Sequence, residues 1–335
     1  MTGRRLLTAI RHRLAGSRLR RIFGGGPKKP SVPGLPNLRQ QTKLPPTNVD
    51  AVLVWTRLGN TGDHLIGDAC ERFLRDRGMT LWRCDGSIEE AALANDTEYL
   101  GDFLSEFRGP VFFSGGGNIG IYADNERIRA AVLAQAGPRR QCLVLPQSAL
   151  KPEPALIDPR VTVWCRDEVS QSILQGRGTR TVLVPDIALY MDDLIPKRPR
   201  GSGCFYIRRT AGVDAERVDH GCDPGCTVED LTLARPLERV LATLEPYEIV
   251  ISDRLHGGLI GLMMRKKVVL LPVTYHKIRA FFDTWLRDAP GAAYAETQAE
   301  LLAALPSVQS PSRDFKALFL EHADPALRRF LSKAA

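Results

Sequence analysis

The chain has 335 residues, of which 44% are hydrophobic, and this length favours two domains, each with its own core. No apolar run reaches the roughly 18 residues that a membrane-spanning helix requires, and the N-terminus lacks the apolar stretch of a signal peptide, so we expect a cytoplasmic protein. The net charge of +8 comes from the first 49 residues, which hold 11 Lys and Arg and no acidic residue, and the remainder carries −3. A main body without excess positive charge argues against nucleic acid as a partner.

Residues 1–48 combine a basic stretch with a linker. Residues 1–24 contain seven arginines, and Leu7, Ile10 and Leu14 share one face at helical spacing. Such a helix suits the anionic inner face of a membrane, although an unstructured basic tail and an organelle transit peptide have similar compositions. Residues 25–48, rich in Gly, Pro and Lys, are typical of a linker.

From residue 49 onward, strands and helices alternate. Strands are predicted at 51–56, 81–84, 111–113, 142–145, 161–165 and 182–184, and helices at 63–77, 126–135 and 168–175. This alternation is typical of a doubly wound parallel sheet and predicts an N-terminal Rossmann-like domain over residues 49–195. The Pro- and Arg-rich residues 195–201 predict an interdomain linker.

A second Rossmann-like domain is predicted over residues 196–312. It consists of a strand at 204–207, a helix at 229–243 and a βαβ unit from 249 to 271, and residues 313–335 add an amphipathic C-terminal helix. The loops that follow parallel strands share the carboxyl edge of the sheet, so residues 252–256 and 274–277 are expected to meet there. The predicted fold class is α/β, with two domains facing a cleft.

Most of the seven cysteines lie in or beside predicted strands and helices. We interpret Cys70, Cys84, Cys142, Cys165 and Cys204 as buried reduced thiols. Cys222 and Cys226 suggest a metal pair, but no second Cys/His pair has zinc-site spacing. We therefore expect neither a metal nor a cofactor.

Several glycine-rich or polar segments follow strands of the first domain. Gly62 permits a tight turn with open N–H groups, and Asp63 either caps the next helix or binds a hydroxyl. Gly116, Gly117 and Asn118 indicate that another backbone or a ligand approaches closely, and the alternative is merely a tight strand-to-helix turn. Arg166-Asp167 also follows a strand, and the same edge gains the polar side chains of Gln147 and Asp186. We expect this edge to form one side of a ligand-binding site.

The second domain holds the strongest candidates for chemistry. His256 lies between Arg254 and two glycines at a predicted strand-to-helix turn, where general acid–base groups are common, although a lone histidine is often structural. An arginine at a strand end, either Arg208 or Arg209, can clamp a carboxylate or phosphate, or belong to a solvated basic surface. The remaining candidates for contacting a ligand are Ser252, Tyr275 and Lys277.

These segments together resemble the polysaccharide pyruvyl transferase family. The matching segments lie at 59–63, 115–118, 145–148, 166–168, 185–186 and 252–257, and Tyr275 and Lys277 follow them. The resemblance implies a glycosyltransferase-B-like pair of Rossmann-like domains and transfer of pyruvate from phosphoenolpyruvate to a sugar as a ketal. By position, Arg254 and His256 match the donor-site Arg and His of the family. The resemblance also implies that Ser252, Tyr275, Lys277 and one of Arg208 and Arg209 contact the donor, and that the first domain lies on the acceptor side. The chain departs from the family at Arg208-Arg209, where two arginines stand instead of one.

Two other functions remain open from the sequence. A nucleotide-sugar glycosyltransferase of the same architecture would bind a diphosphate at residues 252–257 and use His256 as a base. A non-catalytic, membrane-associated assembly protein would keep the fold and dock through its tail, but it would not need the Arg254 and His256 pair. The basic tail suits an enzyme of exopolysaccharide biosynthesis whose acceptor is a lipid-linked oligosaccharide.

Overall fold

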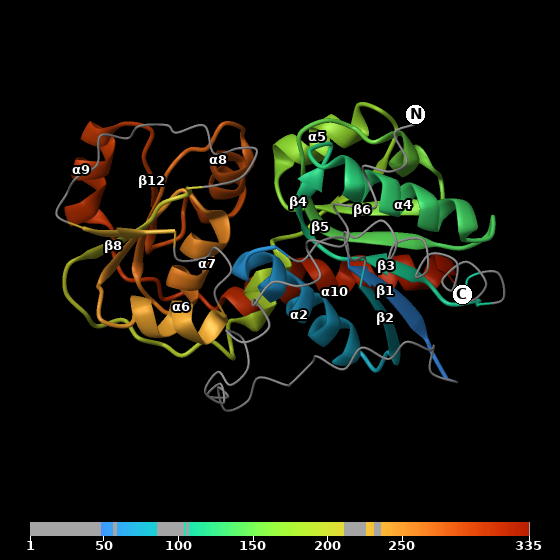
Figure 1. Cartoon of the computed structure of the whole chain (residues 1–335), viewed down its shortest axis with the longest axis horizontal. Helices are drawn as coiled ribbons and strands as arrows, with labels where there is room; N and C mark the ends of the chain where they lie inside the picture. The colour runs from blue at the N-terminus through green and yellow to red at the C-terminus, as the bar shows by residue number, and fades with distance from the viewer. Residues whose placement is uncertain are drawn as a thin grey trace, which may run out of the picture. The chain divides into compact units, whose positions relative to one another are not determined.

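The computed structural model describes residues 48–55, 59–85, 104, 107–210, 226–230 and 236–334. The predicted tail, over residues 1–47, and Cys222 lie outside these ranges. The described residues contain two fully parallel β-sheets with helices between their strands (Figure 1). The predicted α/β class with parallel sheets is therefore confirmed. No helix in the described ranges has the length and apolar character needed to cross a bilayer.

The first sheet has seven strands. Its order is β2 (Leu81–Asp85), β1 (Ala51–Trp55), β3 (Val111–Phe113), β5 (Cys142–Ala149), β6 (Val161–Cys165) and β7 (Arg180–Leu183), and β4 (Gly116–Ile119) pairs with the second half of β5. The helices that follow its strands are α2 (Thr61–Arg75), α4 (Ala123–Gln135) and α5 (Glu168–Gln175), with short 3-10 turns η2 (Pro154–Ile157) and η3 (Ile187–Met191). Every residue of β1, β3 and β5 is buried, as expected for central strands covered on both faces.

The second sheet has five strands. Its order is β12 (Ala292–Tyr294), β11 (Lys267–Leu270), β10 (Ile249–Ser252), β8 (Cys204–Ile207) and β9 (Thr227–Glu229). Its helices are α6 (Leu237–Leu244), α7 (Leu255–Met263), α8 (Lys277–Phe281) with the π-turn η4 (Phe282–Leu286), and α9 (Gln298–Ser307). The last helix, α10 (Phe315–Ala334), packs against η3 of the first half of the chain. The predicted βαβ unit is present as β10, α7 and β11.

Three local predictions are wrong. The predicted helix at 229–243 begins only at Leu237, after Pro236, and its first residue instead belongs to the edge strand β9. The alternative of a tight turn at 116–118 is also wrong: these residues belong to the short strand β4, because β5 runs on to Ala149 and offers it a partner. Cys204 is not a free thiol: it forms a disulfide with Cys226, across a Cα–Cα distance of 5.0 Å.

The other four described cysteines form no disulfide, and three of them are buried, as predicted: Cys70, Cys142 and Cys165. Cys84 is only half-buried.

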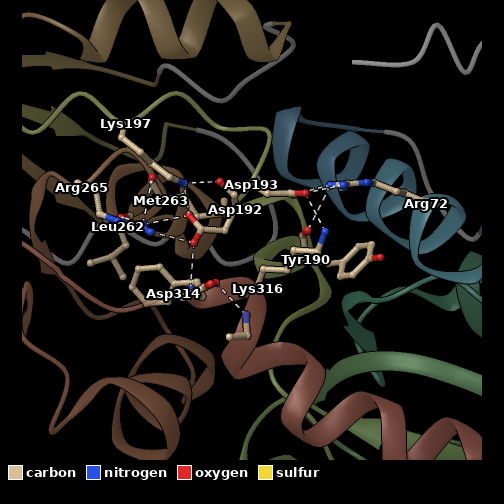
Figure 2. Close-up of polar contacts among 12 residues, drawn as sticks. Arg72, Tyr190, Asp192, Asp193, Lys197, Leu262, Met263, Arg265, Asp314 and Lys316 are labelled. Atoms are coloured by element: carbon tan, nitrogen blue, oxygen red, sulfur yellow. Dashed lines mark hydrogen bonds and ion pairs between the residues drawn. The ribbon is translucent and has the colours of Figure 1, made fainter. Parts of the chain in front are cut away.

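A cluster of ion pairs around Asp192 joins η3 to both α7 and α10 (Figure 2). Asp192 is buried, and its two carboxylate oxygens each accept a hydrogen bond of 3.0 Å from the guanidinium of Arg265, which follows α7. Its Oδ2 also accepts from the backbone N–H of Phe315 at 3.0 Å, and its neighbour Asp193 binds Arg72 of α2 with two bonds of 2.6 Å. These ion pairs and hydrogen bonds connect the two halves of the chain next to residues 195–201, the predicted linker.

Residues 195–201 also make ordered contacts. Ile195 is buried, and the N–H of Arg198 donates to the carbonyl of Met264 at 2.7 Å. Residues 37–335 form one compact unit by their internal contacts. The division into domains at residues 195 and 312 therefore stays a prediction.

Candidate functional site

His256 extends from the second sheet to the first. It lies in the first turn of α7, directly after β10. Its Nε2 lies 3.3 Å from Oδ2 of Asp186, which follows β7 in the first sheet. The Nδ1 side of the ring lies against the first turn of α2, since a Cβ atom added at Gly62 would stand only 2.3 Å from His256 Nδ1. The imidazole is therefore held between a carboxylate and the N-terminus of a helix.

Asp186 is fully buried, and each of its carboxylate oxygens has at least one partner in the protein. Its Oδ2 accepts from Arg166 Nη1 at 2.6 Å as well as facing His256, and its Oδ1 accepts from the N–H of Ala188 at 2.9 Å. Burial alone would raise the pKa of Asp186, but the charge and hydrogen bond of His256, together with Arg166, hold that pKa below its usual value. Asp186 is thus a carboxylate at neutral pH, and it orients the histidine.

Arg166 is the residue whose importance the sequence did not reveal. It is buried, and besides Asp186 it binds Ser148 Oγ through Nε at 2.7 Å, while Ser148 donates to Asp167 Oδ2 at 2.7 Å. A Cβ atom at Gly117 would lie 2.6 Å from Arg166 Nη2 and 3.5 Å from Tyr275 Oη. The available signals were a charged pair placed directly after a buried strand and the family-matching segment at 166–168. A side chain at position 117 would force the guanidinium of Arg166 to shift.

The chain Asp167, Ser148, Arg166, Asp186 and His256 is continuous. The one arginine offsets one of the two carboxylates, so this buried network has no net charge only when His256 is protonated. Its members lie at the ends of four strands, β5, β6, β7 and β10, which is why distant segments meet in one place. Such a network fixes the histidine in one orientation, as an acid–base group requires.

Arg254 occupies a separate position. It precedes α7, is buried, and does not contact Asp186; its Nε and Nη2 bind the two carboxylate oxygens of Asp230 at 2.5 and 2.6 Å. Asp230 follows the edge strand β9 and was not singled out in the sequence. Ser252 stabilises the turn that follows β10, since its Oγ accepts from the N–H of Arg254 at 3.0 Å and donates to the carbonyl of Arg254 at 2.8 Å. Ser252 therefore shapes the loop.

Both candidate arginines after β8 lie beside this pair and are half-buried. The N–H of Arg208 donates to the carbonyl of Glu229, and the N–H of Arg209 donates to Asp253 Oδ1 at 2.6 Å. Burial raises the pKa of Asp253 to about 6, and the hydrogen bonds from the N–H of Arg209 and the hydroxyl of Tyr206 oppose this rise. These bonds hold the backbone of both arginines and leave the choice between their side chains open.

Tyr275 lies in the loop after β11, and Lys277 begins α8. The Lys277 ammonium stands 4.8 Å from the centre of the Tyr275 ring, and Tyr275 in turn lies beside His276. His276 Nε2 is 3.4 Å from Ser170 Oγ in α5, and burial lowers its pKa. The loop after β11 thus also contacts the first half of the chain.

The predicted acceptor-side residues fall into two groups. Asp63 caps α2 in a reciprocal box with Asn60: Asn60 Oδ1 accepts from the N–H of Gly62 and of Asp63, and Asp63 Oδ2 accepts from the N–H of Asn60. The capping alternative thus accounts for Asp63.

The second group is interior. Asn118 Oδ1 accepts from Arg129 Nη1 at 2.8 Å, and Gln147 bridges the N–H of Asn118 and the carbonyl of Ser114. Arg129 is itself paired with the buried Glu153. Gly116 has φ +143°, which a side chain would strain. These residues hold β4 against β5, beside the His256 network.

The described residues contain no group of three or more His, Cys, Asp or Glu side chains arranged to hold a metal ion.

Comparison with known structures supports the fold. An uncharacterised protein from Klebsiella pneumoniae is 18% identical, with a TM-score of 0.53 over 74% of this chain and 94% of its own. A protein from Listeria monocytogenes assigned as a UDP-N-acetylglucosamine 2-epimerase is 10% identical, with a TM-score of 0.50 over 85% of this chain and 96% of its own. At these identities the likeness extends to the fold alone.

Comparison of the sequence with models of protein families identifies the family of the chain. No curated protein matches it. The model of the polysaccharide pyruvyl transferase family matches residues 60–275, a range that contains α2, Arg166, Asp186 and the loop of Arg254 and His256. This match spans more than half of the sequence and agrees with the resemblance carried by the motifs. The chain belongs to the polysaccharide pyruvyl transferase family.

Proposed function

We propose that this protein transfers pyruvate from phosphoenolpyruvate to two hydroxyls of a sugar, as a ketal. The observation that carries the proposal is the placing of His256 against the buried Asp186 and Arg166, next to loops that hold several cationic side chains. Family membership supplies the reaction class, and this arrangement supplies an acid–base group of the kind the reaction requires. The donor, phosphoenolpyruvate, is the only co-substrate in the proposal.

Ketal transfer needs one proton to be delivered and two to be removed. The imidazolium of His256 would donate a proton to the methylene carbon of the enol, which makes the adjacent carbon electrophilic. A sugar hydroxyl then attacks that carbon and loses its proton, the carbon–oxygen bond to phosphate breaks, and the second hydroxyl attacks to close the ketal and loses its proton. Of the two protons released, one replaces the proton that His256 gave to the methylene carbon and the other is taken up by the departing phosphate. Asp186 would stabilise the protonated histidine and fix its ring, while Arg166 keeps Asp186 ionised.

The donor carries a carboxylate and a phosphate, and its charge must be neutralised. Arg254, Lys277 and one of Arg208 and Arg209 are the cations that we assign to it, because planar guanidinium groups bind two oxygens of such anions at once. Tyr275 lies against Lys277 and limits its movement. We place the sugar on the side of α2, Asn118 and Gln147, because these residues lie beside the His256 network in the first half of the chain.

We further propose that the two sheets mark two Rossmann-like domains in a glycosyltransferase-B-like arrangement, and that the tail brings the enzyme to a lipid-linked acceptor at a membrane. The composition of residues 1–24 supports the tail proposal, since basic residues near an anionic surface contribute about 1 kcal/mol each. A protein without residues 1–48 should lose co-sedimentation with anionic vesicles. Full retention by the shortened protein would disprove this role of the tail.

The test of the function is phosphate release from phosphoenolpyruvate with galactosyl, glucosyl and mannosyl acceptors. We expect acceptor-dependent release that falls by about 10²–10⁴-fold in His256→Ala and also falls in Arg254→Ala. Arg127→Ala, which removes an exposed arginine of α4, is the matched control and should retain activity. Thermal stabilisation by nucleotide sugars, without any by phosphoenolpyruvate, would instead favour a nucleotide-sugar glycosyltransferase.

A further inference from the structure

Asp230 is a buried acidic residue at the edge of the second sheet to which neither the motifs nor the proposed chemistry assign a task. It follows β9, the outermost strand, and its side chain is 6% exposed. Its two oxygens accept four hydrogen bonds: one each from Arg254 Nε and Nη2, and two, to Oδ2, from the N–H and hydroxyl of Thr210 at 2.9 Å. One carboxylate thus joins the loop after β8 to the loop after β10.

The geometry points to Asp230 as the residue that positions Arg254 for the donor. Asp230 covers the edge of the guanidinium formed by Nε and Nη2. Among the described residues, no protein acceptor bonds Nη1 of Arg254, so the opposite edge is the part left for an anionic ligand. An arginine has five N–H donors in a rigid plane, and fixing one edge therefore fixes the direction of the other. This inference rests on the proposed function, because it takes Arg254 as a donor-binding group.

The pair is built to persist when the donor binds. The side chains of Arg254 and Asp230 are 7% and 6% exposed, so separating them would leave two uncompensated charges away from water. The two bonds from Thr210 hold Asp230 even apart from the arginine. A carboxylate that only occupied the donor-binding site would have to move away when the donor binds. Asp230 is instead held in place by Thr210 as well as by Arg254. The bonds from Thr210 therefore favour positioning over competition.

The disulfide supports the same strand from its other end. Cys226 directly precedes β9, and its bond to Cys204 ties that end to the start of β8. β9 has only three residues and pairs with β8 alone. Asp230, at the far end of β9, depends on this short strand for its place. The disulfide, β9 and Thr210 together fix the position of Asp230.

The first test measures kinetics. Asp230→Ala should raise KM for phosphoenolpyruvate about tenfold, with kcat and the KM for the sugar changed less than about threefold. Asp230→Asn keeps one acceptor oxygen and should fall between Asp230→Ala and the wild type. Asp158→Asn, which weakens an arginine pair at the start of β6, is the matched control and should leave the KM for the donor unchanged.

A double-mutant cycle separates positioning from general loss of structure. When Arg254 is already alanine, adding Asp230→Ala should change the KM for the donor less than about twofold, because the residue through which Asp230 acts is gone. Equal effects of Asp230→Ala in both backgrounds would overturn the inference, as would a lowered KM in the single variant.

The second test needs no activity. Phenylglyoxal modifies accessible arginines, and mass spectrometry of the peptide that contains Arg254 reports its reactivity. We expect Asp230→Ala to raise this reactivity at least about threefold over the wild type, and Asp158→Asn to leave it unchanged. If the reactivity responds but the wild type neither binds nor uses phosphoenolpyruvate, the proposed function fails and the pairing stands. Unchanged reactivity of Arg254 in Asp230→Ala would overturn the inference whatever the activity.

Discussion

Replacing Gly62 by alanine should disable His256 without disturbing the fold. A Cβ atom at this position would lie 2.3 Å from Nδ1, 2.6 Å from Cγ and 2.8 Å from Cβ of His256. Ordinary van der Waals contact begins near 3.4 Å, so the histidine must retreat by about 1 Å. Rotation of the ring alone does not relieve the clash, since the Cβ of the histidine is among the crowded atoms. A displacement of this size at a reacting group can lower the rate by about 100-fold.

The backbone itself accepts the substitution. Gly62 lies in the first turn of α2 and its φ is not positive, and alanine is intrinsically favoured over glycine in helices by up to about 1 kcal/mol. We therefore expect a melting temperature close to that of the wild type, together with a kcat for phosphate release lowered about 100-fold. Initial rates at saturating donor and acceptor, with melts followed by circular dichroism, measure both.

Gly137→Ala is the matched control, because an added Cβ there has no atom within 4 Å. It should change neither quantity. If Gly62→Ala folded normally and kept the wild-type kcat, then His256 would not need the position observed here, and its role as the acid–base group would be refuted.

Three further predictions follow from individual contacts. Asp186→Asn removes the charge that faces His256 while keeping an acceptor for the Ala188 N–H, and kcat should fall by about 10²-fold or more with little change in the donor KM; an unchanged kcat would contradict the orienting role. Because the pKa of Asp253 is raised, the folded protein binds the proton of this carboxyl group more tightly than the unfolded chain does. Its contribution to stability is therefore full below about pH 4 and is lost as the pH rises through about 6. Between pH 4 and 7, the free energy of unfolding measured in urea should decline less in Asp253→Asn than in the wild type, and an equal decline in both proteins would refute this origin of the pH dependence. Replacing both Cys204 and Cys226 by serine should lower the free energy of unfolding by roughly 3 kcal/mol, since the disulfide closes a loop with a sequence separation of 22; equal stability of the variant and the wild type in urea would contradict a closed disulfide.

The sequence predicted the central βαβ unit well because its apolar runs are short, separated by polar turns and free of competing patterns. Other elements were predicted equally well. The strand Val111–Phe113 and the helix Glu168–Gln175 have the predicted ends, and the predicted strand at Cys204–Ile207 is present. The failures lie at the edges. Whether residues 227–229 form a strand depends on β8 being available as a partner, and a three-residue edge strand carries too little pattern to be distinguished from the start of a helix. The pairing of Cys204 with Cys226 likewise depends on two strands lying side by side.

By itself, the sequence determined which residues lie at the carboxyl ends of strands. Alternating strands and helices oblige those ends to share one edge of a parallel sheet, so His256, Arg254 and Asp186 were identified together. Only the tertiary structure decided how they pair. Asp186 is 70 residues from His256 and Asp230 is 24 from Arg254, and nothing local to either segment encodes which carboxylate faces which cation. That choice depends on the packing of whole strands, because a hydrogen bond forms only where the backbone places both partners within about 3 Å.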